Sequence, residues 1–296
     1  MSAKLIDGKE ISEQVLRETQ AAVIEFRETY GYAPGVAFVR VGEDPASVVY
    51  VGSKAKMSER LGIQSQTYVL PASTSEKEVL ELVRTLNQQK NIHGILVQSP
   101  LPSQIQADCI FESIDPAKDV DGFHPMNMGK LAVGDPTAFV ACTPAGVHQL
   151  LIRSGIEIPG KHVVVLGRSR IVGKPMSLIL MEKGKHADAT VTVCHSRTRD
   201  LPAVTRQADI LIAALGQHRF VRADMVQEGA VVIDVGISRI LDATKKSGYR
   251  LEGDVDFGPV SEKASWITPV PGGVGPMTIA MLMANTLKAA RLQATS

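Results

Sequence analysis

The sequence has few cysteines, almost no net charge and no long apolar run, and each of these gaps excludes a class of protein. Its three cysteines, Cys109, Cys142 and Cys194, are odd in number and lack metal-ligand spacing, which argues against disulfides and zinc. A formal net charge of +1 offers no broad basic surface for nucleic acid or an anionic membrane. No stretch has the apolar length of a bilayer span or a signal peptide. We therefore expect a cytoplasmic protein without a metal centre.

The whole chain has 296 residues, which is long enough for two domains. Along its first half, strands and helices alternate. The alternation predicts right-handed crossovers and a parallel sheet. Ser75 and Glu78 have the spacing of a capping box at a helix start. The expected order is helix 9–30, strand 35–41, helix 47–61, strand 66–70, helix 75–89 and strand 92–98.

After these elements the residue composition changes: residues 115–135 are rich in turn formers and too irregular for one helix or strand. We interpret this segment as the wall of a cleft near a domain boundary. The last helix is strongly apolar, so we expect it to pack back on the first domain. The expected elements are a helix at 143–154, strands at 163–166, 190–194, 209–215, 230–235 and 267–270, and that last helix at 277–292.

The stretch VVVLGRSRIVGKPM at 163–176 has the strand, turn and helix order of a dinucleotide-binding unit. Gly167 allows the chain to reverse and Gly173 allows the backbone to approach a phosphate, because neither carries a Cβ. Ser169 stands where a GxGxxG fingerprint requires glycine, so the match is partial. The predicted fold class is therefore α/β with two domains: an N-terminal domain with a parallel sheet, residues 1–140 plus 277–296, and a Rossmann-like nucleotide-binding domain, residues 141–276.

Polar side chains at the ends of adjacent strands favour NADP over NAD as the cofactor. His195, Ser196 and Arg197 follow the strand at 190–194, where an NAD-type fold would place an acid for the ribose hydroxyl. Together with Arg168, they offer cations and a hydroxyl that suit the ribose phosphate of NADP. The alternative is that both arginines belong to a solvated loop.

Candidate substrate-binding residues lie in the first half of the chain. Tyr50 and Lys54 are four residues apart on one helix and therefore share a face. Gln98 ends a parallel strand, at the edge of the sheet where α/β proteins bind ligands. Asp121 and its neighbour Asp119 either face a ligand or bond their own backbone, as aspartate beside glycine often does. For Lys54 the alternative is an ordinary solvated lysine, and for Gln98 it is a side chain that only caps the next loop.

Five ordered motifs together resemble one family, the bifunctional methylenetetrahydrofolate dehydrogenase and methenyltetrahydrofolate cyclohydrolase of the FolD type. They are YVGSK at 50–54, QSPLP at 98–102, KDVDGFHP at 118–125, GRSRIVGKP at 167–175 and TPVPGGVGPMT at 268–278. The resemblance implies NADP as cofactor, tetrahydrofolate derivatives as substrates, a homodimer, a folate cleft between the domains, and a place in one-carbon metabolism and purine biosynthesis.

The resemblance also implies roles for individual residues. Lys54 is the residue that catalysis needs, and it lines the folate site with Tyr50, Gln98 and Asp121. Ser99 departs from the leucine that the family more often has. Combined with the motifs, the cofactor-binding candidates are Gly167, Arg168, Ser169, Val172, Gly173, Ser196, Arg197, Gly216, Gly236 and Ile237. We assign Pro271, Gly272, Gly275 and Pro276 to the substrate, although PGGVGP could equally line the cofactor or be a rigid connecting loop.

The two reactions place different demands on these residues. A nitrogen lone pair can expel the hydride from methylenetetrahydrofolate, so alignment alone serves the oxidation. Hydrolysis of the methenyl cation needs a base, and Lys54 can act as one because burial and a cationic substrate both disfavour a second positive charge. Tyr50 and Gln98 would position Lys54 and the water, while Asp121 would fix the pterin ring. The alternatives are a monofunctional dehydrogenase, an NADP dehydrogenase of shikimate dehydrogenase-like layout, and a non-catalytic NADP sensor.

Overall fold

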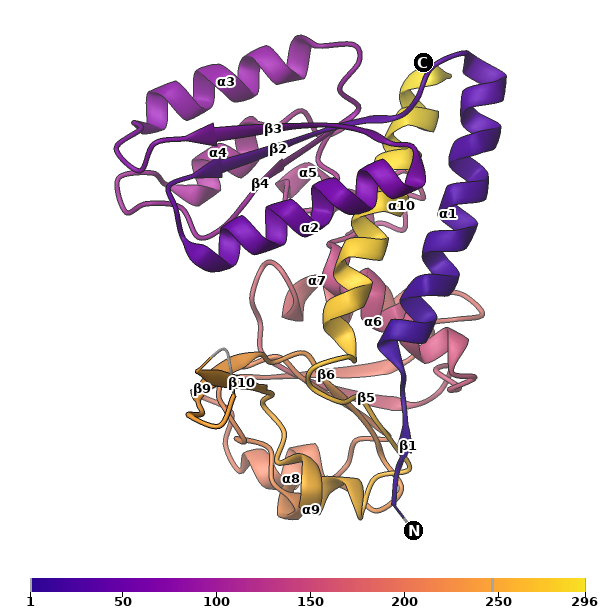
Figure 1. The fold of residues 1–296 in the computed structure, drawn as a ribbon. Helices are drawn as coiled ribbons and strands as arrows, with labels where there is room; N and C mark the ends of the chain where they lie inside the picture. The colour runs from indigo at the N-terminus through magenta and orange to yellow at the C-terminus, as the bar shows by residue number, and fades with distance from the viewer. Residues whose placement is uncertain (1, 246–247, 296) are drawn as a thin grey trace. The chain divides into compact units, whose positions relative to one another are not determined.

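The computed structural model describes residues 2–245 and 248–295, and these form two compact units (Figure 1). Unit 1 comprises Met1–Ser12 and Thr143–Thr278, and unit 2 comprises Glu13–Cys142 and Ile279–Ser296. This division differs from the expected domains mainly in the first twelve residues, and by two residues at the other boundaries. They belong to unit 1 because β1 (Lys4–Leu5) pairs in parallel with β11 (Trp266–Ile267).

Unit 2 is built on a three-stranded parallel sheet with the order β3-β2-β4. The central strand, β2, is buried at every position, as expected of the apolar run GVAFVRV. Helices α2 and α3 cover opposite faces of this sheet (Figure 1). The elements of unit 2 are α1 (Gly8–Tyr30, which starts in unit 1), β2 (Gly35–Val41), α2 (Pro45–Leu61), β3 (Gln64–Leu70), α3 (Glu76–Gln88), β4 (Gly94–Val97), α4 (Ala107–Ser113), α5 (Pro125–Ala132) and most of α10 (Val274–Ala294).

Local capping signals set the ends of α2 and α3. Asp44 caps the start of α2 by accepting a hydrogen bond from Ser47 N at 2.8 Å, and Gly62 ends it in the left-handed conformation that glycine adopts without strain. At α3 the expected capping box is present in both directions between Ser75 and Glu78. These caps fix where α2 begins, and therefore where its buried face meets the sheet.

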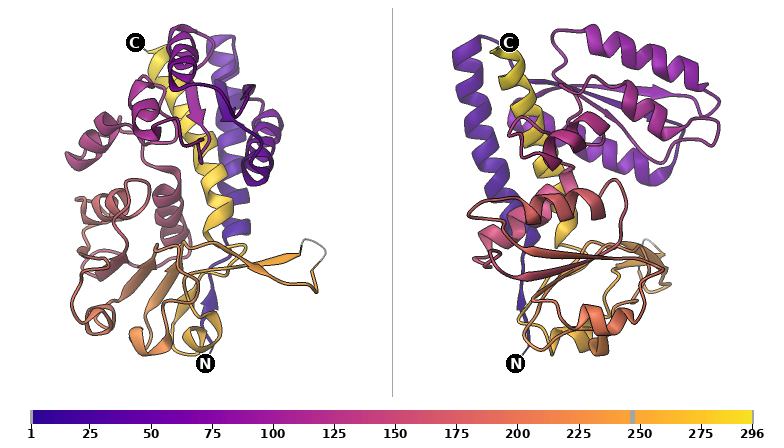
Figure 2. Two further views of the ribbon diagram at one scale, coloured as in Figure 1. Left: turned by 90° about the vertical axis from the view of Figure 1, so that its left-hand side faces the viewer. Right: turned by 180° about the vertical axis from the view of Figure 1, so that it is seen from behind.

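The last helix packs on unit 2, as predicted. Asn285 donates hydrogen bonds to the carbonyl oxygens of Val120 and Val140 at 2.9 and 3.0 Å. Within the same unit α10 and α1 lie side by side, joined near their outer ends by an ion pair between Arg291 and Glu25 (Figures 1 and 2). The carbonyl contacts of Asn285 tie α10 to the KDVDG segment, which contains Asp121.

Unit 1 contains a six-stranded parallel sheet with the order β1-β11-β8-β7-β5-β6. The chain runs from β5 to β6 on one side and then crosses to β7 on the other, so the direction of winding switches between β5 and β7. Ligands of such sheets bind outside the carboxyl ends of the strands at this switch. The further elements are α6 (Cys142–Arg153), β5 (His162–Leu166), α7 (Gly173–Met181), β6 (Thr190–Cys194), α8 (Leu201–Thr205), β7 (Ile210–Ala213), the 3-10 turn η1 (Ala223–Met225), β8 (Val231–Asp234) and α9 (Phe257–Ser261).

Several short elements differ from the expectation. An antiparallel hairpin of β9 (Ser238–Leu241) and β10 (Tyr249–Glu252) projects from the sheet of unit 1 (Figure 2). Helix α5 lies within the segment that we expected to be irregular, because Pro125 starts a helix whose first turn is capped by His124. Among the described residues, no helix combines the length and apolarity needed to cross a membrane.

Candidate functional site

Lys54 lies on the buried face of α2 and is not a solvated lysine. The buried positions of the helix are Ser47, Val51, Lys54, Ser58 and Leu61, and Lys54 is only 8% exposed. Charged side chains are seldom buried to this degree without a partner. The structure therefore favours a specific role for this ammonium group over the solvated alternative.

Gln98 supplies that partner from the carboxyl end of the sheet. Lys54 Nζ donates a hydrogen bond to Gln98 Oε1 at 2.9 Å, and Gln98 Nε2 donates to the carbonyl oxygen of Ser99 at 2.6 Å. The amide is thus held at both ends, with its oxygen turned toward the lysine. Because the acceptor of the second bond is the backbone carbonyl of Ser99, the leucine that the family more often has at this position would retain the bond. Tyr50 lies one turn before Lys54 and is 45% exposed.

The two aspartates of KDVDG have different roles. Asp119 is almost completely buried and accepts hydrogen bonds from the amides of Gly122, Phe123 and His124 at 2.8–3.1 Å. It also accepts one from Asn127 Nδ2 at 2.8 Å. Asp119 is therefore the residue that organises the turn, which leaves Asp121 as the carboxylate available for a ligand.

The charge of Asp121 is set by its surroundings. Burial of its carboxyl group raises the pKa of Asp121 to about 6, and the negative charge of Asp119 acts in the same direction. The positive charge of Lys54 opposes both effects. Burial also raises the pKa of the adjacent Cys142 thiol, so this thiol stays neutral. At neutral pH the carboxyl group of Asp121 is accordingly mostly ionised, and it interacts electrostatically with Lys54 within unit 2.

In unit 1, the glycines of the central motif make a turn too tight for any side chain. Gly167 has a φ of 118°, and a Cβ on it would overlap the carbonyl oxygen of Ala214, which follows β7. A Cβ on Gly173, the first residue of α7, would overlap the carbonyl oxygen of Gly167. The turn therefore presents bare backbone at the switch between β5 and β7, which suits the close approach of a phosphate.

The polar side chains around this turn suit an anion. Just before α7, Ser169 Oγ accepts hydrogen bonds from the amides of Val172 and Gly173 at 3.2 and 3.5 Å. Arg168, Ser196 and Arg197 are exposed, and no carboxylate in the described part of the chain lies within ion-pair distance of either arginine. Two cations without counter-ions near a helix N-terminus fit the phosphates of NADP.

Two buried aspartates that fix the loops of the other candidate cofactor-binding residues were not predicted from the sequence. Gly216 follows β7 and Gly236 follows β8, with exposed Ile237 next to it. Their loops are tied to two buried carboxylates, Asp234 and Asp254. The available signal was the GDVD sequence at 253–256, an acidic pair beside a glycine, which local patterning assigns to an ordinary turn.

The PGGVGP run belongs to unit 1 and starts the last helix. Gly272 has a φ of 106°, and Gly275 and Pro276 lie in the first turn of α10. A Cβ on Gly8 would overlap the carbonyl oxygen of Gly273, so the run packs closely on the start of α1. The run is therefore a close-packed connection, and its assignment to the substrate, with Pro271 included, stays a prediction.

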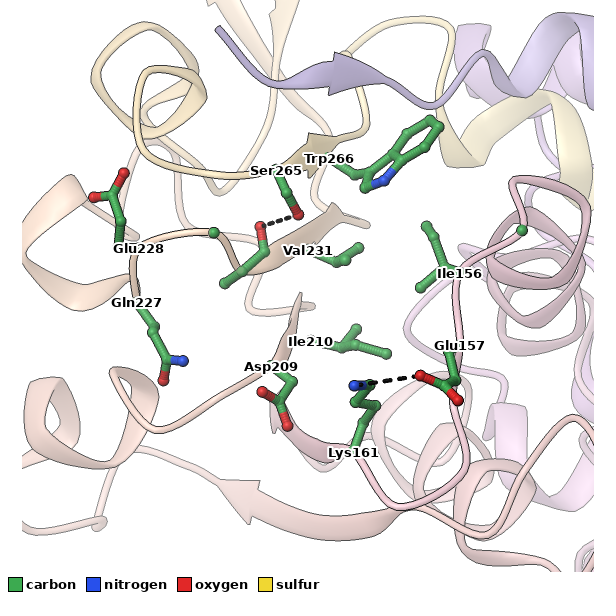
Figure 3. A pocket seen from close by; sticks show the side chains of 13 residues that line it. Ile156, Glu157, Lys161, Asp209, Ile210, Gln227, Glu228, Val231, Ser265 and Trp266 are labelled. Carbon is green, nitrogen blue, oxygen red and sulfur yellow. Dashed lines mark hydrogen bonds and ion pairs between the residues drawn. The ribbon is translucent and has the colours of Figure 1, made fainter. Parts of the chain in front are cut away.

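The best-formed surface pocket is not lined by the candidate site residues. This pocket of about 310 Å³ in unit 1 is bordered by Lys161, Asp209 and Trp266 at the amino ends of the strands (Figure 3). There Lys161 pairs with Glu157 across 3.5 Å. Because ligands of parallel sheets bind at the opposite, carboxyl ends, this pocket is not the expected cofactor site. Within the described ranges, no group of three His, Cys, Asp or Glu side chains could hold a metal ion.

The fold and these two sets of residues define a class: an α/β protein with a nucleotide-binding turn in one unit and a buried lysine site in the other. Residues 6–121 match the family described as tetrahydrofolate dehydrogenase/cyclohydrolase, catalytic domain, and residues 141–294 match the NAD(P)-binding domain of the same family. The chain belongs to the tetrahydrofolate dehydrogenase/cyclohydrolase family.

Individual relatives cover nearly the whole chain. The bifunctional protein FolD of Chlorobium phaeovibrioides is 56% identical over 284 residues, 96% of each chain. The structure of the bifunctional FolD enzyme from Campylobacter jejuni has a TM-score of 0.91 at 48% identity, covering 98% of this chain and 99% of that one. The Trypanosoma brucei FolD complexed with NADP cofactor and inhibitor has a TM-score of 0.93 at 38% identity, covering all of both chains.

These matches confirm the predicted family, the α/β fold, and the class of enzyme, a dehydrogenase and cyclohydrolase with an NAD(P)-binding domain. A shikimate dehydrogenase from Thermus thermophilus, complexed with NADP(H) and shikimate, covers 87% of this chain and 99% of its own with a TM-score of 0.52 at 13% identity. That likeness concerns the fold alone. The rival based on a shikimate dehydrogenase-like layout therefore has no support beyond the fold.

Proposed function

We propose that this protein oxidises 5,10-methylenetetrahydrofolate with NADP and hydrolyses the methenyl product to 10-formyltetrahydrofolate, with Lys54 as the general acid and base of the hydrolysis. The observation that carries this proposal is the buried Lys54 ammonium, held 2.9 Å from Gln98 Oε1 on the carboxyl side of the sheet. A lysine that only needed solvation would not occupy the buried stripe of α2.

For the oxidation, the chain supplies binding and alignment. When bound, NADP supplies the acceptor for the hydride. The bare backbone at Gly167 and Gly173 would hold its phosphates, and Arg168 with Arg197 would pair with the ribose phosphate. Asp121, ionised at neutral pH, would accept a pair of hydrogen bonds from the pterin ring. Fixed alignment of the reacting groups is worth roughly 7–11 kcal/mol of the barrier, which leaves no need for a strong base in this step.

For the hydrolysis, Lys54 must move a proton. A water molecule attacks the cationic methenyl carbon, and neutral Lys54 takes one of its protons. Lys54 then gives this proton to the ring nitrogen as the C–N bond breaks, and the second proton of the water is lost to solvent as the formyl C=O forms. The cationic substrate favours the neutral form of the amine, because two positive charges in one buried site repel. Gln98 Oε1 keeps the nitrogen of Lys54 in place through the cycle, and Tyr50 lies one turn away to orient the water or the substrate.

We also propose that the enzyme is a cytoplasmic homodimer. The resemblance to the family supports the dimer, and the three unpaired cysteines support a reducing compartment. Light scattering coupled to size exclusion gives the molar mass in solution, and a mass of about one chain, 31.8 kDa, would contradict the dimer.

The residue assignments are tested by a pair of aspartate variants. Asp121→Asn removes one acceptor of the pair that would bind the pterin, so KM for the folate substrate rises about tenfold or more in both reactions while KM for NADP is unchanged. Asp119→Asn is the matched control, because that carboxylate bonds the backbone; it lowers the thermal midpoint instead. An unchanged folate KM in Asp121→Asn would remove Asp121 from the site.

A further inference from the structure

The loops that follow β7 and β8 are held by buried carboxylates and not by packing alone. These strands are neighbours in the parallel sheet of unit 1, so the loops at 214–217 and 235–237 leave the same edge. The loops contain three of the cofactor candidates, Gly216, Gly236 and Ile237. Whatever fixes the loops therefore fixes the surface that faces the cofactor.

Asp254 holds the first loop. Its side chain is fully buried and accepts hydrogen bonds from the amides of Leu215, Gly216 and Gln217 at 2.6, 2.9 and 2.7 Å. Three consecutive amides directed at one carboxylate define the path of the backbone at the end of β7. An asparagine could not replace it fully, because an amide has one acceptor oxygen and its NH2 group would face an amide donor.

Asp234, the last residue of β8, holds the second loop and Asp254 itself. Its Oδ1 accepts from the amides of Gly236 and Asp254 at 3.0 and 2.9 Å, and its Oδ2 accepts from Val255 N at 2.9 Å. The amide of Asp234 in turn bonds Thr268 Oγ1 at 2.7 Å. The two carboxylates are thus arranged in series: Asp234 holds the backbone of Asp254, and Asp254 holds the loop at 215–217.

The two carboxyl groups pack so closely on the neighbouring backbone that there is no space for a side chain at Gly236 or Gly253. A Cβ on Gly236 would overlap the carboxyl group of Asp254, and a Cβ on Gly253 would overlap that of Asp234. Among the described residues, no lysine, arginine or histidine lies within ion-pair distance of either carboxylate. Burial raises the pKa of Asp234 to about 7, and the charge of Asp254 adds to this effect. Two buried carboxyl groups are therefore held side by side by backbone amides, an unfavourable arrangement for a part that only had to fold.

We propose that Asp234 and Asp254 are positioning residues of the dehydrogenase reaction, which fix the loops at 214–217 and 235–237 against the cofactor. This inference rests on the proposed assignment of those loops to NADP. It concerns unit 1, whereas Lys54, Gln98 and Asp121 belong to unit 2. The hydrolysis of methenyltetrahydrofolate needs no nicotinamide cofactor, so this second activity reports on the folding of the variants.

The test compares Asp254→Asn and Asp234→Asn with Asp256→Asn. Asp256 lies two residues beyond Asp254, and its carboxylate interacts with the exposed Arg219 at 3.8 Å. For Asp254→Asn we expect KM for NADP to rise about tenfold to a hundredfold and the dehydrogenase kcat to fall, with hydrolysis of supplied methenyltetrahydrofolate within about twofold of wild type. Asp234→Asn likewise keeps at most two of its three bonds, so it should raise KM for NADP in the same direction, whereas Asp256→Asn leaves both activities unchanged.

Equal loss of both activities in Asp234→Asn and Asp254→Asn would overturn the proposal, because a merely structural pair would affect the whole chain. Unchanged NADP kinetics in Asp254→Asn would also overturn it. Direct titration of each protein with NADP by calorimetry separates this question from the proposed function. If the wild-type protein binds NADP without turnover, the proposed enzymatic function is wrong, but weaker NADP binding by Asp254→Asn still supports the positioning role. Equal NADP affinities of wild type and Asp254→Asn would count against that role.

Discussion

Replacing Lys54 by methionine separates the two activities most sharply. Methionine keeps most of the buried stem of the side chain and removes the ammonium group, so α2 retains its packing. The loss of a hydrogen bond from a charged group to Gln98 costs about 1.5–3 kcal/mol, which lowers the thermal midpoint by several degrees. Without the neighbouring cation the pKa of Asp121 rises further above its value of about 6, and a larger fraction of this carboxyl is protonated at pH 7.

The kinetic consequence follows from the roles of the lysine. General acid and base catalysis typically contributes about 10²–10⁴-fold, so Lys54→Met loses that factor in hydrolysis. Hydride transfer needs alignment and not a base, so dehydrogenase kcat falls by about tenfold or less, mainly through the changed charge of Asp121. The assay follows NADPH formation from methylenetetrahydrofolate, and separately the decay of supplied methenyltetrahydrofolate against a protein-free control. Lys56→Met, on the exposed side of α2, is the matched control. Equal loss of both activities in a folded Lys54→Met protein would refute the separation of roles.

Three further predictions concern the cofactor turn and the pH response. Arg168→Ala should raise KM for NADP about tenfold or more and leave KM for NAD nearly unchanged, because only NADP has the ribose phosphate; equal effects on both cofactors would exclude this contact. Gly173→Ala should weaken NADP binding at least tenfold in calorimetry, because its Cβ overlaps the carbonyl oxygen of Gly167, whereas Gly129→Ala, with open space around it, should not. KM for the folate substrate should rise as the pH falls below about 6 and Asp121 becomes protonated, and a folate KM that is flat from pH 5 to 8 would contradict the role of that carboxylate.

The raised pKa of Asp121 also determines how this group affects stability. In the folded protein its ionisation is disfavoured relative to the unfolded chain, where the pKa is about 3.9. The folded state therefore binds the proton more tightly, and the contribution of Asp121 to the free energy of unfolding falls as the pH rises from about 4 to about 6. The ionised carboxylate that we propose to bind the pterin is thus present at neutral pH at some expense of stability.

The sequence predicted the elements whose signals are local. Capping residues and apolar alternation specify α2, α3 and the strands of both parallel sheets other than β1, and the structure confirms these elements within a few residues. Strand β1 was missed because its two residues pair with β11, more than two hundred and fifty residues away. Helix α5 was missed because a proline and a histidine cap start it inside a segment otherwise rich in turn formers.

The chemical environment of the candidate residues could not be predicted from the sequence. The motifs named Lys54 and Gln98, but the burial of the lysine depends on which face of α2 meets the sheet. The choice between Asp119 and Asp121 required the amide bonds of the turn, which only the folded backbone shows. Local patterns gave Asp234 and Asp254 no specific role, because their partners lie on loops that come together only when the sheet forms.

The measurement that tests the central claim most directly uses the wild-type enzyme with methylenetetrahydrofolate and NADP. NADPH formation is followed first, and then the decay of the methenyl product against a protein-free control. The account predicts both NADPH formation and accelerated decay. NADPH without accelerated decay would leave a monofunctional dehydrogenase and remove the proposed role of Lys54, and the absence of NADPH would contradict the account as a whole.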